Sequence, residues 1–211
     1  MDEKKKKALG EIIVFVVLDI LVIVLGNYLM RYFIWNDLRW MLLVLPMLMA
    51  LELACVFGVL GIFKDSDRNL GFSKSKIWLQ ILYGSVLFFG MLLIFKLFGN
   101  SCMGQPFRLD IILAFSLWDA FSAAVTEELA YRGLLFTRLK TCTDNTIAAI
   151  VVSSVLFGAS HFLVGDIRHI IMSTMTGVLL CTARVYLKNC TLVSTMTAHF
   201  LYDFLMCYIV I

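Results

Sequence analysis

The stretch IIVFVVLDILVIVLGNYLMRY, Ile12 to Tyr32, is apolar almost throughout and holds one acidic residue, Asp19. A transmembrane helix needs roughly 17 to 25 predominantly apolar residues to cross the hydrocarbon core of a bilayer. Similar stretches recur along the whole chain, of which 61% is hydrophobic and only 16% is charged. A water-soluble domain of 211 residues would need far more polar surface. The sequence therefore predicts an all-α, polytopic membrane protein.

The apolar stretches divide into seven predicted transmembrane helices, so the chain is predicted to be a single integral-membrane domain, residues 1–211. The predicted spans are Ile12–Tyr32, Trp40–Phe63, Ile77–Phe98, Ile111–Phe136, Thr146–Leu163, Ile170–Leu187 and Leu192–Ile211. The fourth span is irregular. As a straight helix from Leu109 to Leu139 it would be about 45 Å long, against a hydrocarbon core of about 30 Å. We expect it to tilt, bend or protrude.

Basic residues concentrate in alternate connections between the predicted spans. The four clusters are Lys4–Lys7, Lys64–Lys76, Arg138–Lys140 and Arg184–Lys188. Short loops rich in Lys and Arg stay on the cytoplasmic side of a membrane. The pattern predicts a multi-pass protein of the cell membrane with its N-terminus in the cytoplasm and its C-terminus outside.

Net charge and cysteine spacing exclude several classes of function. The net charge is only +3 and the basic residues are scattered over loops, which does not predict a nucleic-acid groove. No CxxC or paired spacing occurs, so the cysteines predict neither a disulfide framework nor a metal cluster. The six cysteines are Cys55, Cys102, Cys142, Cys181, Cys190 and Cys207. The lipid bilayer is the one partner that composition implies, and the oligomeric state stays open.

The stretch TEELAYRGLLFTRL, Thr126–Leu139, places three charged residues inside the fourth predicted span. Charged groups within a membrane are costly and usually functional. On a helix, Glu128 and Arg132 share one face and can pair, while Glu127 is turned about 100° away. A buried ion pair that only locks two helices together explains Glu128 and Arg132 equally well. It does not explain the second glutamate.

Two later segments supply histidines at related positions. If the chain turns near Cys142, Glu127 and His161 differ in depth by only about 6 Å, so the two side chains can meet. His199 and Asp203 are four residues apart in HFLYD, so the aspartate can fix the orientation of the imidazole. Polar pairs that hold helices together are the alternative interpretation of both histidines.

Three motifs in this half of the chain resemble those of one family. EELAYR from Glu127, FGASH from Phe157 and HFLYD from His199 match EExxxR, FxxxH and HxxxN/D in the CPBP family. This family comprises the CAAX proteases, related to the Ras-converting endoprotease, and bacteriocin-processing (Abi) enzymes. The resemblance implies an intramembrane glutamic endopeptidase whose catalytic core is residues 111–211.

The resemblance also implies a role for each motif residue. Glu127 would be the general base and His161 its partner in activating a water molecule. Glu128 and Arg132 would support the site, and His199 with the residue at 203 would stabilise the oxyanion. Many members have Asn at the last position. Asp203 is therefore either protonated or acts by orienting His199, and we favour orientation.

No cofactor is expected. Glu127, His161 and His199 together are also a possible zinc ligand set. The sequence has no HExxH motif, and the resemblance implies water activation without a tightly bound metal. Bound zinc is therefore the less favoured alternative.

Other functions and residues remain open. A peptide or membrane-protein substrate is expected, in peptide processing, bacteriocin self-immunity or signalling. A non-catalytic membrane protein that regulates a sensor kinase or binds a bacteriocin is the main alternative. A proton-coupled transporter is a weaker one, because the sequence shows no repeat. Asp19, Glu52 and Asp119 have no assigned role, although Asp119 can line the same cavity, and His169 is expected to be solvated.

Overall fold

The computed structural model describes residues 2–34, 40–64, 70–73, 76–98, 109–163 and 165–206. Every regular element among these residues is helical, which confirms the predicted all-α class. The elements are α1 (Glu3–Leu29), η1 (Met30–Ile34), α2 (Met41–Ile62), α3 (Ile77–Phe98), α4 (Leu109–Glu127), η3 (Glu128–Leu135), α5 (Phe136–Thr143), α6 (Thr146–Ser160), η4 (His161–Leu163), α7 (Ile167–Tyr186) and α8 (Leu192–Met206).

Four helices in the described part of the chain are long and apolar enough to cross a membrane. They are Glu3–Phe33, Leu43–Ile62, Ile77–Phe98 and Thr146–Leu163, and they fall on the first, second, third and fifth predicted spans. The other three predicted spans are not among them, so a total of seven stays a prediction. The last part of the seventh, residues 207–211, lies outside the described residues.

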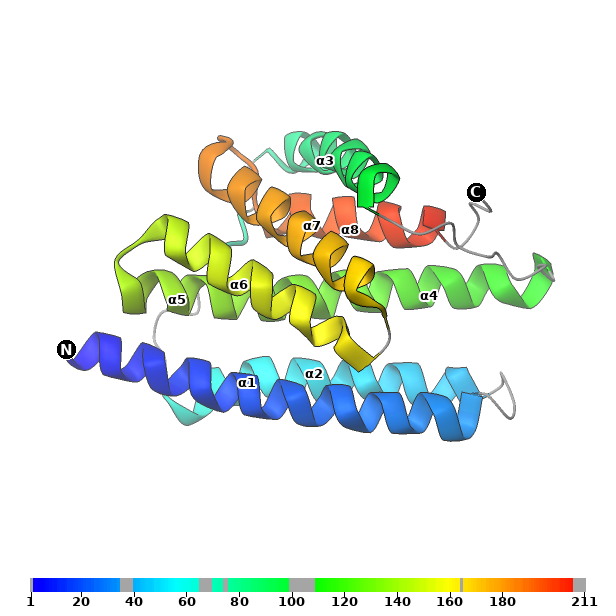
Figure 1. Cartoon of the computed structure of the whole chain (residues 1–211), viewed down its shortest axis with the longest axis horizontal. Coiled ribbons are helices and arrows are strands. Elements are labelled where there is room, and N and C mark those ends of the chain that lie inside the picture. The colour runs from blue at the N-terminus through cyan, green and yellow to red at the C-terminus, as the bar shows by residue number, and fades with distance from the viewer. Residues whose placement is uncertain are drawn as a thin grey trace.

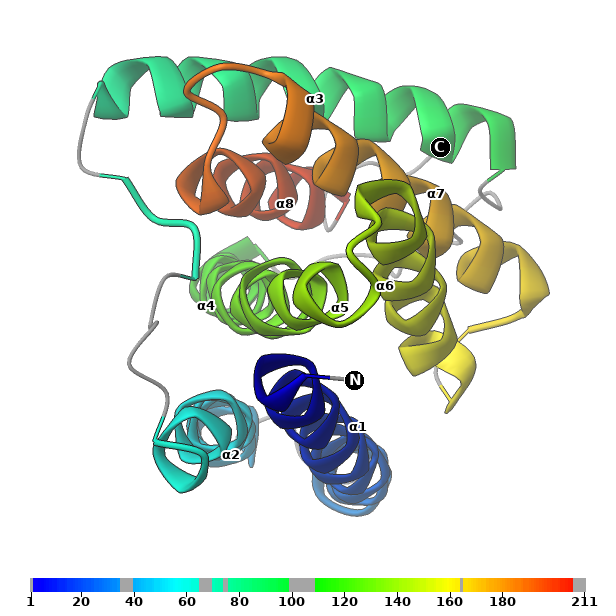
Figure 2. The ribbon, with the colours of Figure 1, turned by 90° about the vertical axis from the view of Figure 1, so that its left-hand side faces the viewer.

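A single helical rod runs through the middle of the bundle. Figure 1 shows α4, η3 and α5 following one another along the molecule, and Figure 2 shows this rod at the centre, seen end on. The rod packs against α2 and α8 through α4, and against α1 and α6 through α5. Its middle segment, η3, is a π-helix, a rare form that occurs mostly at functional sites. The irregular length of this span was predicted, but the π-helix was not.

The rod ends in a tight turn close to the predicted position at Cys142. Asp144 adopts a left-handed conformation with φ of 53°, which ends α5. The side-chain oxygen of Asn145 then accepts a hydrogen bond from the backbone N–H of Ala148, at 3.0 Å, and caps α6. The turn reverses the chain, so α6 runs back along the rod toward the level of Glu127.

The described residues of the four basic clusters lie toward one end of the molecule, on the left side of Figure 1. Lys5 forms an ion pair with Asp144, which ties the start of α1 to the α5–α6 turn. Arg184 donates a hydrogen bond to the backbone oxygen of Leu70, at 3.0 Å, which ties α7 to the α2–α3 connection. The predicted orientation of the two termini in the membrane stays a prediction.

Glycines bring α6 and α7 close together near the site. A Cβ atom at Gly158 would lie 2.7 Å from the backbone oxygen of Ile170, so only glycine permits this approach. A Cβ atom at Gly177 would lie 3.0 Å from the Cβ of Ser154. α6 ends at Ser160 near this close contact, and His161 is its C-cap.

Candidate active site

The predicted pair in η3 forms. Glu128 Oε1 lies 3.0 Å from Arg132 Nη1, and both side chains are buried, with 0% and 1% of their surface exposed. A charged side chain that is taken out of water is costly unless an opposite charge lies beside it. Glu128 is therefore neutralised by its own helix.

His199 of α8 lies among three carboxylates. Its Nδ1 donates a hydrogen bond to Glu128 Oε1 at 3.0 Å. On the other side of the ring, Nε2 lies 3.2 Å from Asp203 Oδ2 and 3.7 Å from Glu127 Oε2. Because an ionised carboxylate can only accept, a protonated imidazole is the form that satisfies both sides of the ring. The predicted proximity of His199 and Asp203 is confirmed.

Glu127 is more exposed than its neighbour in the chain. Its side chain is 26% exposed, and its Oε2 accepts no hydrogen bond from the described residues. Arg132 pairs with Glu128, as predicted, but His199, which the sequence did not place beside Glu127, lies within ion-pair distance of it. The cause is the packing of α8 against η3, which helical geometry within one segment does not reveal.

His161 reaches the same space as Glu127 from α6. Both side chains line a cavity of about 310 Å³, and Asp19, Glu52 and Tyr131 also line it. No hydrogen bond or ion pair is recorded between Glu127 and His161, so the predicted meeting takes the form of a shared cavity. His161 Nδ1 lies 2.9 Å from the backbone oxygen of Phe157. Since a carbonyl oxygen only accepts, Nδ1 carries the proton and Nε2 can accept a hydrogen bond.

Phe157 lies at the centre of the site. The Arg132 guanidinium lies 3.9 Å from the centre of its ring, a favourable cation–π contact. The ring centre is 5.1 Å from that of His161 and 6.1 Å from that of His199, edge to face in both cases. The spacing FxxxH places Phe157 one turn before His161 but does not reveal these other contacts.

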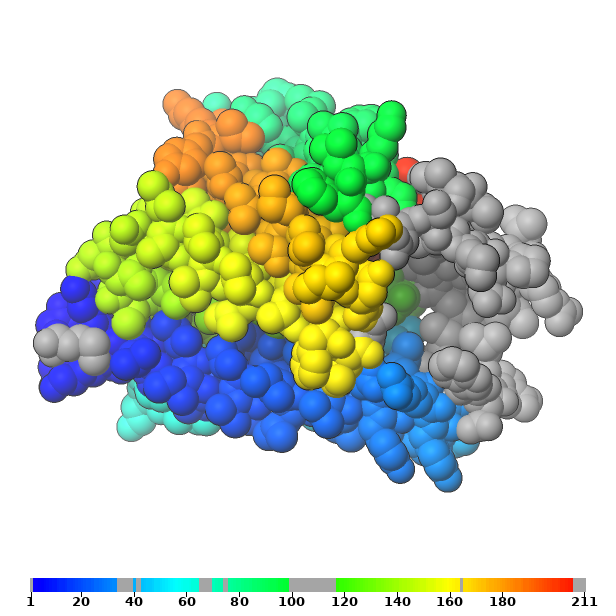
Figure 3. Space-filling model, viewed as in Figure 1, coloured from blue at the N-terminus to red at the C-terminus, as the bar shows by residue number. Residues whose placement is uncertain are grey.

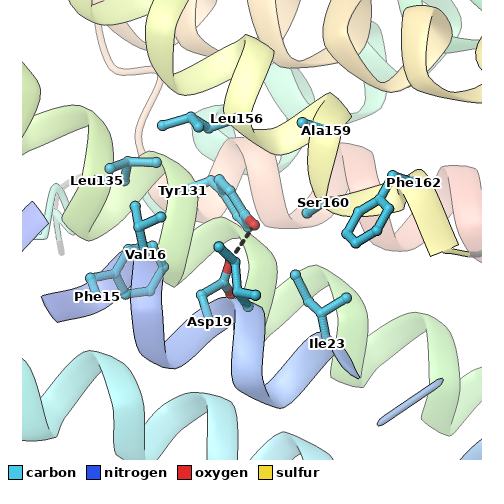
Figure 4. A pocket seen from close by; sticks show the side chains of 11 residues that line it. Phe15, Val16, Asp19, Ile23, Tyr131, Leu135, Leu156, Ala159, Ser160 and Phe162 are labelled. Carbon is cyan, nitrogen blue, oxygen red and sulfur yellow. Dashed lines mark hydrogen bonds between the residues drawn. The ribbon is translucent and has the colours of Figure 1, made fainter. Parts of the chain in front are cut away.

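Tyr131 and Asp19 form a contact that sequence reasoning missed. The Tyr131 hydroxyl donates a hydrogen bond to Asp19 Oδ2, at 2.6 Å (Figure 4). Tyr131 follows Glu127 by four residues, and Asp19 comes from α1, more than a hundred residues earlier in the chain. An acidic residue inside the first apolar stretch was the available signal, but nothing in the sequence named its partner.

The remaining acidic and histidine candidates separate in the structure. Glu52 of α2 lines the cavity with Glu127, whereas Asp119 is exposed and is not among the residues that line it. The expectation that His169 is simply solvated is wrong. It lies half-buried in the first turn of α7, and its ring centre is 5.1 Å from that of His161.

The described residues offer no metal site, and their cysteines are not bonded to one another. They contain no group of three or more His, Cys, Asp or Glu side chains placed to hold a metal ion. Catalysis without a metal stays a prediction. Cys55, Cys142, Cys181 and Cys190 carry free thiols, and Cys102 and Cys207 lie outside the described residues.

Comparison with known families identifies the segment that carries this site. A family model, described as type II CAAX prenyl endopeptidase Rce1-like, matches residues 109–205. This segment is therefore similar to the Rce1-like family. The match covers α4 to α8 and all six predicted site residues, which confirms the resemblance to CAAX proteases. No curated protein and no solved structure matches the chain.

The Rce1-like segment does not complete the cavity alone. Asp19 of α1 and Glu52 of α2 line it from helices that precede the matched residues. Long apolar helices lie both before the matched segment and within it. Together with the family match, they indicate a membrane protein.

Proposed function

We propose that this protein is an intramembrane endopeptidase in which Glu127 is the general base. One observation carries the proposal: the Glu127 side chain is 26% exposed and lines the cavity, while Glu128 is fully buried against Arg132 and His199. A base must have an accessible oxygen to take a proton from water. Of the two adjacent glutamates, only Glu127 has a side chain that is partly exposed and lines the cavity.

The proposed reaction begins with a water molecule in the cavity between Glu127 and His161. Glu127 takes one proton from the water while His161 Nε2 accepts a hydrogen bond from the second O–H and orients it. The water oxygen forms a bond to the carbonyl carbon of the peptide. The C–N bond then breaks, and Glu127 gives its proton to the leaving amine.

His199 and Asp203 are proposed to serve the oxyanion. In the resting site the Nε2–H of a protonated His199 lies 3.2 Å from Asp203, which orients the ring, and this N–H is shared with the oxyanion when it forms. A preorganised donor of this kind contributes about 3 kcal/mol to transition-state stabilisation. Glu128 and Arg132 support the site by fixing the other side of the same ring.

The substrate is proposed to be a peptide or a membrane-associated protein. By the distribution of basic residues, we place the N-terminus in the cytoplasm and the C-terminus outside the cell membrane. Peptide processing, bacteriocin self-immunity and signalling are the proposed settings. A regulatory membrane protein that binds a sensor kinase or a bacteriocin without cleaving it is the alternative.

A purified full-length protein tests the proposal. Responsive peptides are found first with the wild type, and cleavage is then measured for Glu127→Gln. We expect kcat/KM to fall by about 10² to 10⁴, the usual contribution of a general base. Glu52→Gln, which removes another carboxyl group of the same cavity, is the matched control and should lose less than about tenfold. Equal cleavage by wild type and Glu127→Gln would contradict the mechanism. If cells that carry Glu127→Gln keep the phenotype that deletion of the protein removes, the regulatory alternative is favoured.

A further inference from the structure

A second, smaller pocket opens beside the catalytic cavity, between α1 and α6. Its volume is about 160 Å³, and Figure 4 shows the side chains around it. The lining is apolar except for Asp19, Tyr131 and Ser160. The residues that line it are Phe15, Val16, Asp19, Ile20, Ile23, Tyr131, Leu135, Leu156, Ala159, Ser160 and Phe162.

The pocket shares a wall with the catalytic cavity. Asp19, Ile23, Tyr131 and Ser160 line both spaces. Tyr131 lies one helical turn after Glu127, and Ser160 directly precedes His161. Only the side chains of this shared wall therefore separate a group in the pocket from Glu127 and His161.

The pocket also reaches the outer surface of the bundle. α1 packs against α2 and α5, while α6 packs against α5 and α7, so α1 and α6 flank a seam. The far end of this seam is tied by a hydrogen bond from Asn27 Nδ2 to the backbone oxygen of Leu163, at 3.3 Å. Ile20 and Phe162 line the pocket with about half of their surface exposed, whereas Phe15 and Leu135 are buried at its inner wall. Figure 3 shows α1 and α6 side by side on this face.

The size and chemistry of the pocket limit which chemical groups can bind in it. A dry apolar cavity of about 150 Å³ holds one benzene molecule, so this space fits one aromatic ring or one branched aliphatic side chain. Its carboxylate does not call for a cationic ligand, because Asp19 already accepts the hydrogen bond of Tyr131. A prenyl or acyl chain has more than twice as many carbon atoms as a benzene ring and does not fit within it.

We propose that this pocket is a specificity subsite that binds one aromatic or branched aliphatic side chain of the substrate, from a residue that flanks the scissile bond. The inference rests on the proposed endopeptidase function and deepens it. Residues of α1, outside the matched family segment, would then decide which peptides are cleaved.

The test uses full-length protein and peptides that differ only in the residues flanking the mapped cleavage site, with Ala, Leu or Phe in each position. Val16→Leu and Ala159→Leu narrow the pocket, and Leu156→Ala enlarges it. Val17→Leu and Val155→Leu are matched controls, because both lie on the same helices, are half exposed and do not line the pocket. One misfit methylene in such a site changes kcat/KM by about 10- to 200-fold.

We expect wild type to favour Phe or Leu over Ala at one flanking position by at least about tenfold. Narrowing should abolish this preference while the Ala peptide is cleaved within about twofold of wild type, and the two controls should retain it. The subsite is overturned if both narrowed variants keep the preference of the wild type, or if kcat/KM falls equally for all peptides. Faster cleavage of a prenyl-cysteine peptide than of the Phe peptide also overturns the subsite, because the pocket would then bind a lipid chain and not an amino-acid side chain.

A second measurement separates failure of the subsite from failure of the enzyme. A peptide with photo-leucine, a branched aliphatic residue that carries a diazirine, at the flanking position is bound to Glu127→Gln protein and photolysed. Cross-links to α1 residues 15–23 or α6 residues 156–162 support the subsite even if wild type cleaves nothing. Cross-links elsewhere overturn it, whatever the cleavage assay shows.

Discussion

Glu127 and Glu128 are neighbours in the chain, yet their carboxylates lie in opposite environments. Glu128 is fully buried and contacts Arg132 and His199, whereas Glu127 is partly exposed to a cavity that it shares with His161. The first region is a closed set of buried charges, and the second is open to the cavity. The comparison teaches that one motif can supply both the rigid support of a site and its reactive group.

The largest effect is expected in the closed region. Arg132→Met leaves Glu128 as a buried charge with only His199 to offset it, so the free energy of unfolding should fall by about 3 kcal/mol. Unfolding of purified protein in detergent measures the loss. The double variant Glu128→Gln/Arg132→Met removes both charges and should recover most of it. Equal stability of wild type and Arg132→Met would contradict the description of this pair as a buried ion pair.

Glu128→Gln tests whether the closed region orients the reactive one. The amide should hold His199 less well, so we expect kcat/KM to fall by about 10- to 100-fold, the usual cost of removing a supporting partner. KM should change little, because Glu128 does not line the cavity. A variant that cleaves as fast as wild type would show that the hydrogen bond to His199 is not needed.

Phe157→Leu removes the ring that joins the two regions. The variant loses a buried cation–π contact and edge contacts with two histidines, so we expect about 2 kcal/mol less stability. Phe89→Leu, on the exposed face of α3, is the matched control and should change stability by less than about 0.5 kcal/mol. If both variants lose the same amount, the ring of Phe157 contributes nothing beyond its size.

The smallest effect is expected at Asp203. An asparagine oxygen can still accept a hydrogen bond from His199 Nε2, so Asp203→Asn should cleave within about threefold of wild type. Asp203→Ala loses the contact, worth about 1 kcal/mol, and should cleave about five- to tenfold more slowly. Equal rates for the two variants would mean that Asp203 does not position the imidazole.

Much of the fold could be predicted from the sequence because the bilayer imposes simple rules. Long apolar stretches must be helical, since backbone groups in lipid can bond only within the helix. The spans from Ile77 to Phe98 and from Thr146 to Leu163 end where the helices of the structure end. The π-helix at Glu128 was not predicted, because helical periodicity in the sequence does not distinguish it from an α-helix.

The contacts in the site are of two kinds, local pairs within one helix and contacts between distant segments. The sequence by itself determined the pairs that are local: Glu128 with Arg132 and His199 with Asp203 are each four residues apart, so one helical turn brings them together. Only the tertiary structure decided which helices meet. It set His199 between Glu127 and Glu128, joined Tyr131 to Asp19 and brought His169 to His161, because contacts between distant segments depend on packing that no local pattern encodes.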